Sequence, residues 1–359
     1  MTTLSPPPVR MGACGRRGQR RKAFLVISPL EGKTLKVLSP RKAVLACALA
    51  AATVLAACSS DSADAEAADG FRTVVDSEGT EVEVPEDPQR VIALNFSATQ
   101  SVLDLGVTLV GQGAYRPGLL PEGRETELDN VPIVLDDEKP NIEEIASLEP
   151  DLILIPNVFD SAVNDQLREI APSYVYSHGS EKRGDWQNRV SEVADAINHT
   201  EEAEQLDADF QARQSEIAES YAEDLEEYSF GIVGSYNPQE FYAMGSTSMV
   251  GEILAPIGVR WSEDEDAAVA DAPGAENTFS FEELGSVLGD ADVLLYSTNL
   301  LGETDELIDA LLANSLFESL PAAENDRLFP WGKMTVAGYT DAFYSLDQFE
   351  AALQDLQNR

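Results

Sequence analysis

The sequence predicts an α/β protein of two like lobes that are joined by a single long helix, with a cleft between the lobes. Strand-like apolar runs alternate with helix-like segments before and after the charged segment 200–225, and this alternation is typical of parallel α/β construction. One helix–strand pattern also occurs twice, at 141–155 and at 280–296. A chain of 359 residues is long enough for two lobes with separate cores. The predicted parts are a signal region, 1–57, a tether, 58–70, an N-terminal lobe, 71–199, a connecting helix, 200–225, and a C-terminal lobe, 226–359.

The N-terminal region has the pattern of a secretory signal. Basic residues, the last of them Lys42, precede an uninterrupted run of small and apolar residues, 43–57, which ends at Leu55-Ala56-Ala57-Cys58. A cysteine at this junction resembles a bacterial lipoprotein signal, in which Cys58 is lipidated and becomes the first mature residue. Because residues 1–36 reach far ahead of such a signal, we expect 37–57 to be the true signal, with translation starting near Val37. A twin-arginine signal is the alternative.

The charge is distributed very unevenly along the chain. Ten of the 24 basic residues but only one of the 64 acidic residues precede Cys58, so residues 58–359 carry 14 bases against 63 acids. Nucleic acid is therefore excluded as a partner, because phosphate binding requires clustered lysine and arginine. The acidity indicates a solvated, self-repelling surface, and a specific cationic ligand is the alternative. Because the other two cysteines precede Cys58, no disulfide is expected in the mature protein.

The first lobe follows a tether, 58–70, that contains no large apolar residue. Apolar runs predict its strands, and segments with helical periodicity predict its helices. The predicted strands are 91–94, 109–110, 152–155 and 174–176, and the predicted helices are 98–105, 142–148 and 163–170.

The segment 200–225 is predicted to be one continuous helix. Its apolar residues recur at intervals of four and seven, which places them on one narrow stripe, and no glycine or proline interrupts it. Glu201 and Glu202 lie where the positive end of the helix dipole favours acids. An ordinary surface helix of a single domain is the alternative. The apolar residues of the stripe are Leu206, Phe210, Ile217, Tyr221 and Leu225.

The second lobe repeats the alternation of the first. Its predicted strands are 230–233, 241–243, 293–296 and 328–329, and its predicted helices are 249–256, 281–288, 307–313 and 342–356. Each copy of the repeated pattern opens with a capping box, Asn141 with Glu144 and Ser280 with Glu283. Two lobes of like architecture explain this repeat better than chance convergence does.

The sequence contains no catalytic signature. His178 and His199 are too far apart and too isolated for a metal cluster or a serine–histidine pair, and no glycine-rich phosphate loop follows a strand. We therefore expect no enzymatic activity and no cofactor. A lipid-anchored adhesin or enzyme on the same α/β framework is the alternative from another class.

Four features in order resemble the solute-binding proteins of ABC importers that carry ferric siderophores, haem and cobalamin. They are 82–92, with Val82-Glu-Val-Pro85; 143–155, with Leu-x-Pro-Asp-Leu-Ile at 148–153; the long helix; and 320–329, with Leu320-Pro-Ala-Ala323. The resemblance implies two Rossmann-like α/β lobes with the ligand in the cleft between them. It also implies a monomer that is anchored to the membrane by lipid and delivers a ferric siderophore to an ABC permease and its ATPase. Haem or cobalamin is the alternative ligand within the family.

The resemblance also suggests two kinds of site. Glu143 and Glu252, one on each lobe, match by position the acids that meet arginines of the permease, and two separated carboxylates would fix the orientation of docking. The cleft would be lined by residues that follow strands. These are Phe96, Tyr115, Arg116, Asn157 and Phe159 in the first lobe, and Tyr236, Asn299, Trp331 and Lys333 in the second.

The expected ligand chemistry follows from the residue types in this cleft. Aromatic rings would cover the apolar parts of a chelate, and Arg116 or Lys333 would meet its anionic oxygens. Because basic residues are scarce after Cys58, a neutral hydroxamate chelate fits this chain better than a highly anionic catecholate.

Overall fold

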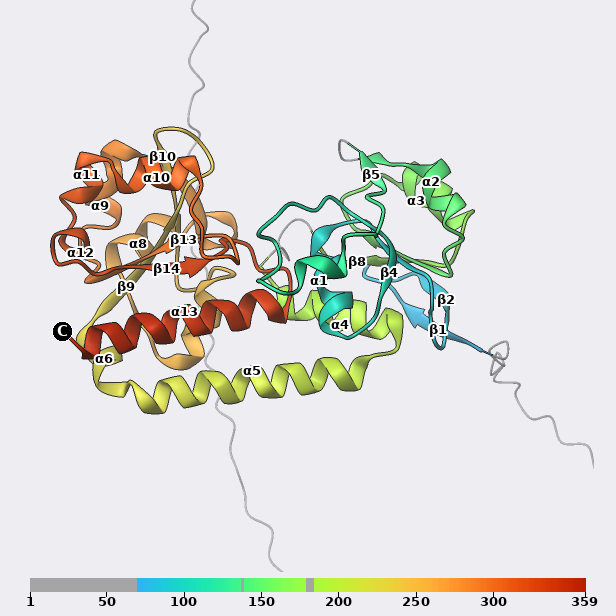
Figure 1. The fold of residues 1–359 in the computed structure, drawn as a ribbon, viewed down its shortest axis with the longest axis horizontal. Coiled ribbons are helices and arrows are strands. Elements are labelled where there is room, and N and C mark those ends of the chain that lie inside the picture. Colours follow the sequence, from blue (N-terminus) through green and yellow to red (C-terminus); the bar gives the residue numbers. More distant parts are fainter. Residues whose placement is uncertain (1–69, 137–138, 179–183) are drawn as a thin grey trace, which may run out of the picture. The chain divides into compact units, whose positions relative to one another are not determined.

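The computed structural model describes residues 70–136, 139–178 and 184–359 (Figure 1). The predicted signal region, Cys58 and nearly all of the tether therefore lie outside the described residues. Within the described residues, no helix combines the length and the apolar character that a membrane span requires.

The first sheet is four-stranded, entirely parallel and ordered β4-β3-β7-β8. Strands β3 and β7 are buried along their whole length, as expected for a parallel sheet that is covered on both faces. A β1–β2 hairpin precedes the sheet. The strands are β1 (Phe71–Val75), β2 (Glu81–Pro85), β3 (Val91–Ala93), β4 (Leu109–Gln112), β5 (Leu135–Asp136), β6 (Lys139–Pro140), β7 (Leu152–Pro156) and β8 (Ser173–Tyr176).

The α-helices of this half begin at side-chain caps. Asn95, Asn141, Asp160 and Asp185 each accept a hydrogen bond from a backbone N–H of the first turn, which satisfies a donor that the helix leaves unpaired. These local signals explain why the sequence predicts most helices of the half. The helices are α1 (Phe96–Asp104), η1 (Glu125–Glu127), α2 (Ile142–Ser147), α3 (Ser161–Arg168) and α4 (Trp186–Ile197).

The predicted continuous helix 200–225 is divided in the structure. Helix α5 (Thr200–Ser220) ends before Tyr221, and α6 (Ala222–Glu227) begins after it. Tyr221 has φ −123° and ψ 24°, which is not helical. Its ring is buried in the core, and its hydroxyl donates to Glu350 Oε1 at 3.2 Å. The prediction of an unbroken helix is therefore wrong at this residue, where no glycine or proline signals the break.

The second sheet is six-stranded and mixed. Its order is β12-β10-β9-β13-β14, with β11 also pairing with β9; β13 runs parallel to both β9 and β14, whereas β10 runs antiparallel to β9 and β12. The strands are β9 (Ser229–Gly234), β10 (Glu240–Met244), β11 (Arg260–Trp261), β12 (Glu276–Ser280), β13 (Val293–Ser297) and β14 (Leu328–Gly332).

Short helices connect these strands, and one long helix closes the chain. They are α7 (Gly251–Leu254), η3 (Ala255–Ile257), α8 (Glu263–Val269), η4 (Pro273–Ala275), η5 (Phe281–Glu283), α9 (Leu284–Val287), α10 (Glu306–Leu312), α11 (Ser315–Glu318), α12 (Pro321–Glu324) and α13 (Tyr339–Gln357). The predicted helix 281–288 is thus a 3₁₀ turn followed by a short α-helix. The lobe boundaries at 199/200 and 225/226 remain a prediction.

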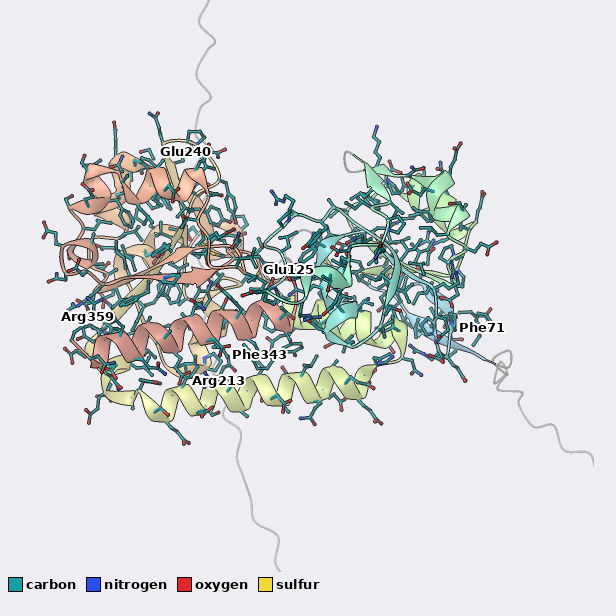
Figure 2. All side chains as sticks on the ribbon, viewed as in Figure 1. Phe71, Glu125, Arg213, Glu240, Phe343 and Arg359 are labelled. Atoms are coloured by element: carbon teal, nitrogen blue, oxygen red, sulfur yellow. The ribbon has the colours of Figure 1, made fainter. Side chains whose placement is uncertain are left out.

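Helix α13 packs beside α5 (Figure 1). Arg213, labelled in Figure 2, reaches from α5 to α13, where its guanidinium pairs with Asp347 and Glu350. The first turn of α13 also contacts α1 of the first half, because Gln100 Nε2 donates to Asp341 Oδ1 at 2.9 Å. The two sheet-bearing halves are therefore connected by α13 as well as by the predicted connecting helix.

A carboxyl group is buried beneath the second sheet. Glu265 is 0% exposed and accepts hydrogen bonds from the backbone N–H groups of Ile232 and Met244. Burial raises its pKa well above the usual range, and the acids Asp266 and Asp290 add to the effect. Its contribution to stability is thus fully present below the unfolded-state pKa and is lost as the pH rises through the folded-state pKa.

We expect Glu265→Gln to reduce the loss of stability that accompanies rising pH above about 4.3, the pKa of glutamate in an unfolded chain. The amide keeps an acceptor for the backbone but cannot ionise. Each unit of difference between the folded and unfolded pKa values corresponds to about 1.4 kcal/mol. Urea unfolding between pH 4 and pH 9 measures the effect, with the exposed Glu263→Gln as the control. Equal pH dependence of the wild type and Glu265→Gln would contradict the assignment.

Candidate functional site

A cavity of about 310 Å³ opens beside the ends of three neighbouring strands of the second sheet. Ser235 and Tyr236 follow β9, Thr298 and Asn299 follow β13, and residues 333–335 follow β14. Because β9, β13 and β14 are adjacent and parallel, their carboxyl ends meet at one edge, where open α/β sheets bind ligands. The full lining is Arg116, Pro117, Gly118, Leu119, Ser235, Tyr236, Ser297, Thr298, Asn299, Glu303, Thr304, Asp305, Ile308, Lys333, Met334 and Thr335.

The first half contributes one wall of the cavity, the loop 116–119. Leu300 N donates to the carbonyl of Gly118 at 2.9 Å, which joins this loop to the loop after β13. Gly118 has φ +83°, and a Cβ at this position would lie 2.5 Å from Asn299 Nδ2. Only glycine therefore fits both the backbone conformation and the close contact.

Asn299 organises the loop that carries the acids of the cavity. Its Oδ1 accepts hydrogen bonds from the backbone N–H groups of Leu301 and Glu303, both at 2.9 Å, and its Nδ2 donates to Glu303 Oε2 at 3.1 Å. Asp305 then caps α10 by accepting from Leu307 N and Ile308 N. These bonds hold both acidic side chains at the cavity as hydrogen-bond acceptors.

The charge of Lys333 is largely compensated within the protein. Its Nζ lies 2.7 Å from Asp341 Oδ2, and the two side chains are 10% and 2% exposed. The same ammonium lies 4.9 Å from the centre of the Phe96 ring, which adds a cation–π contact. Lys333 is therefore a poor partner for an additional anion, in contrast to its expected role.

Four predicted cleft residues line this cavity: Arg116, Tyr236, Asn299 and Lys333. Arg116 and Tyr236 are exposed there, and the Tyr236 ring packs edge-on against Tyr242 at 5.1 Å. Among the described residues, the Arg116 side chain has no hydrogen-bond or ion-pair partner, so its charge is available to a ligand.

Phe96 and Tyr115 lie next to the cavity without lining it. Their rings pack together, with centroids 6.3 Å apart, and both rest on the core of the first half. Burial raises the pKa of the Tyr115 hydroxyl, with help from Glu125 and Asp129, so this tyrosine stays neutral. Phe96 reaches the site only through its contact with Lys333.

Trp331 requires a correction. It is 0% exposed and packs in the core between the second sheet and the helices, on the same strand face as Phe329. Strand β14 continues to Gly332, so Trp331 lies inside the strand rather than after it. The prediction that it lines the cleft is wrong, because side chains alternate along a strand and its face is inward.

Asn157 and Phe159 follow β7, as the sequence predicts, but line neither of the cavities described for this chain. Asn157 Oδ1 accepts from the backbone N–H of His178 at 2.9 Å, and Phe159 packs against the core of the first sheet. Their contact with a ligand remains a prediction.

Several lining residues were missed by the sequence reasoning, namely Ser235, Ser297, Thr298, Glu303, Thr304, Asp305, Met334 and Thr335. Most directly follow or end a strand, which is the signal that could have found them. They are mostly small polar or acidic residues, whereas most of the predicted cleft residues are aromatic or basic.

The two predicted docking acids are exposed. Glu143 lies in the first turn of α2, after the cap Asn141, and Glu252 lies in α7. Partial burial raises the pKa of Glu252, and the nearby Asp185 adds to the effect. Among the described residues, no group of three or more histidines, cysteines or acids could hold a metal ion.

Comparisons with known proteins identify the family of this chain. Residues 91–335 match the family model described as periplasmic binding protein. The "Probable siderophore-binding lipoprotein YfiY" of Bacillus subtilis (strain 168) is 27% identical over 313 residues, which covers 84% of this chain and 94% of the relative.

Solved structures share the fold. The siderophore periplasmic binding protein from the fuscachelin gene cluster of Thermobifida fusca has 30% identity and a TM-score of 0.65, and the match covers 75% of this chain and 97% of that one. Staphylococcus aureus SirA complexed with staphyloferrin B has 21% identity and a TM-score of 0.61, with 79% and 98% covered. The model match spans most of the described chain, and this chain belongs to the periplasmic binding protein family.

Proposed function

We propose that this protein captures a ferric siderophore outside the cytoplasmic membrane and delivers it to an ABC permease and its ATPase, without catalysis of its own. The observation that carries the proposal is the cavity of about 310 Å³ at the ends of β9, β13 and β14, with a wall from the first half. Small polar groups surround it, and Tyr236 and Arg116 are exposed in it. Such a lining can bind the oxygens and the apolar surface of a chelate. Iron would be cargo, bound through the chelate.

The comparisons support this proposal. The relative in Bacillus subtilis is named as siderophore-binding and as a lipoprotein, and the structure from Thermobifida fusca is titled as a siderophore binding protein. A lipid anchor at Cys58, which the lipoprotein-like junction supports, and a monomeric state are part of the proposal. Haem and cobalamin are the other ligands to compare.

We expect intrinsic fluorescence to fall when a ferric siderophore binds at submicromolar concentration. Iron chelates absorb emitted light, and Tyr236 lines the cavity. The measurement is a titration with a panel of ferric hydroxamates, a ferric catecholate, ferric citrate, haem and cobalamin. A fluorescence change with haem or cobalamin alone would identify that compound as the ligand in place of a siderophore. No change with any compound of the panel would contradict the uptake function.

A matched pair of variants locates the binding. Tyr236→Ala should weaken binding about tenfold, because it removes an exposed aromatic surface, whereas Tyr236→Phe should keep most of the affinity. Equal affinity of Tyr236→Ala and the wild type would mean that the ligand binds elsewhere.

A further inference from the structure

The cavity is lined by charged residues of both signs. Two bases, Arg116 and Lys333, and two acids, Glu303 and Asp305, line it. The ammonium of Lys333 is already matched by the buried carboxylate of Asp341 at 2.7 Å. One guanidinium and two carboxylates therefore remain for a ligand.

Hydrogen bonds fix the side chains of the two acids, Glu303 and Asp305, at the cavity. Both are exposed to solvent, and both are held in place by hydrogen bonds from neutral donors, Asn299 Nδ2 for Glu303 and the first-turn N–H groups of α10 for Asp305. Neutral donors hold a carboxylate without cancelling its charge, in contrast to the ammonium–carboxylate pair of Lys333.

The negative potential continues beyond this cavity. A second cavity, of about 590 Å³, is lined by Pro121, Glu122, Glu125, Leu300, Leu301 and Tyr344, and none of these residues is basic. The two cavities are neighbours, because Gly118, which lines the first, accepts a hydrogen bond from the backbone N–H of Leu300, which lines the second. Glu125, labelled in Figure 2, lies in the η1 turn of this wall.

The chain as a whole reinforces the local balance. Residues 58–359 carry 63 acids against 14 bases, which attracts cations and repels anions over distances up to the Debye length, about 10 Å at 0.1 M salt. An anionic chelate would meet unfavourable potential during approach as well as at the site.

We propose that this protein selects a ferric chelate that carries a positively charged group, and that Glu303 and Asp305 bind that group. The inference rests on the proposed function, and names the charge class of its ligand. A hydroxamate core is neutral when it holds Fe³⁺ with three groups, so an alkylamine tail would supply the positive charge. Arg116 remains available for the chelating oxygens.

The test uses three ferric complexes of one linear trihydroxamate that differ only at the terminal amine. The free amine gives a cation, the N-acetylated form is neutral, and the N-succinylated form is an anion. We expect affinity to fall about fivefold at each step, since a unit charge a few ångströms from a carboxylate in watery surroundings changes affinity by about this factor. The differences should shrink in 1 M salt, where the Debye length is about 3 Å.

Variants test whether Glu303 and Asp305 cause the preference for the cationic complex. Glu303→Gln and Asp305→Asn, combined, should bring the ratio between the cationic and neutral complexes close to one. Asparagine still caps a helix, so α10 is kept. Glu306→Gln, on the same helix but not in the cavity lining, should leave the ratio unchanged. An unchanged ratio in the double variant would overturn the assignment to these acids.

The outcomes separate this inference from the proposed function. Tightest binding of the cationic complex supports both. Equal affinities in the series, or tightest binding of an anionic chelate such as ferric citrate, would overturn the charge selection while the uptake function stands. Absence of binding to every chelate, haem and cobalamin would overturn the uptake function, and the selection with it.

Discussion

Replacing Arg124 with alanine is expected to lower the free energy of unfolding by about 3 kcal/mol, the low end of the cost of unpairing a buried charge. Arg124 Nη1 lies 3.0 Å from Asp104 Oδ1, and the Asp104 side chain is only 2% exposed. Without the guanidinium, this carboxylate would stay buried without a partner of opposite charge. Urea unfolding followed by the fluorescence of the buried tryptophans measures the loss.

The position of this pair explains why the effect should reach both halves of the molecule. Asp104 ends α1, and its Oδ2 accepts the backbone N–H of Thr340, in the first turn of α13, at 3.0 Å. Arg124 and Asp104 also both bond the Thr340 hydroxyl. The cluster therefore fixes the start of α13 to α1.

The pH dependence provides a second readout of the same variant. Burial raises the pKa of Asp104, and the bonds from Thr340 and Arg124 offset this only in part. Since protonation removes the charge that Arg124 compensates, the cost of Arg124→Ala should shrink as the pH falls through the pKa of Asp104. The destabilisation by Arg124→Ala should therefore be largest at pH values where the Asp104 carboxyl is ionised.

Two controls distinguish the buried charge from lost packing. Glu127→Gln removes the more exposed partner of Arg124 and should cost less than about 1 kcal/mol, as surface pairs do. The double variant Asp104→Asn, Arg124→Ala should be more stable than Arg124→Ala alone. If the double variant is the less stable one, the unpaired charge is not the cause.

Reversing the charge at Glu143 and Glu252 together is expected to abolish uptake and to leave ligand affinity unchanged. Both side chains are exposed, and neither lines a described cavity. In the proposed docking, each carboxylate meets arginines of the permease, so a lysine would turn attraction into repulsion at both ends of the contact. The measurement pairs a titration of purified protein with iron uptake by cells that depend on it.

Glu169→Lys combined with Glu306→Lys is the matched control, because it introduces the same charge at two other exposed acids. It should transport normally. Loss of ligand affinity in Glu143→Lys, Glu252→Lys would mean that the acids belong to the binding site instead. Normal uptake by that variant would exclude them from docking.

Much of the fold could be predicted from local sequence. The strands of the first sheet, most strands of the second and most α-helices follow from apolar periodicity and from caps such as Asn141 and Asp160, because these signals act within a few residues. The short or peripheral strands β1, β2, β5, β6, β11 and β12 were not predicted. The rule that ligands bind after strands pointed to Arg116, Tyr236 and Asn299, and these three residues line one cavity, whereas their contact with a ligand remains a prediction. The alternation of side chains along β14 would also have predicted that Trp331 points inward, but the predicted strand, 328–329, ended before this residue.

The state of Lys333 could not be predicted in this way. Its partner Asp341 lies on α13, the helix that follows β14. Asp341 also accepts a hydrogen bond from Gln100 of α1, so the position of this carboxylate depends on how α13 packs against α1. The break at Tyr221 likewise depends on packing against α13, not on a local helix breaker.

The sequence by itself determined the α/β class, the strands of the first sheet and most strands of the second, the lipoprotein-like junction at Cys58 and the acidity of residues 58–359. The tertiary structure alone decided which charges remain for a ligand, because it pairs Lys333 with Asp341 and leaves Glu303 and Asp305 beside Arg116. The physical reason is distance. Periodicity and capping act within a few residues of the chain, whereas the electrostatics of a cavity depend on side chains that only the packed fold brings together.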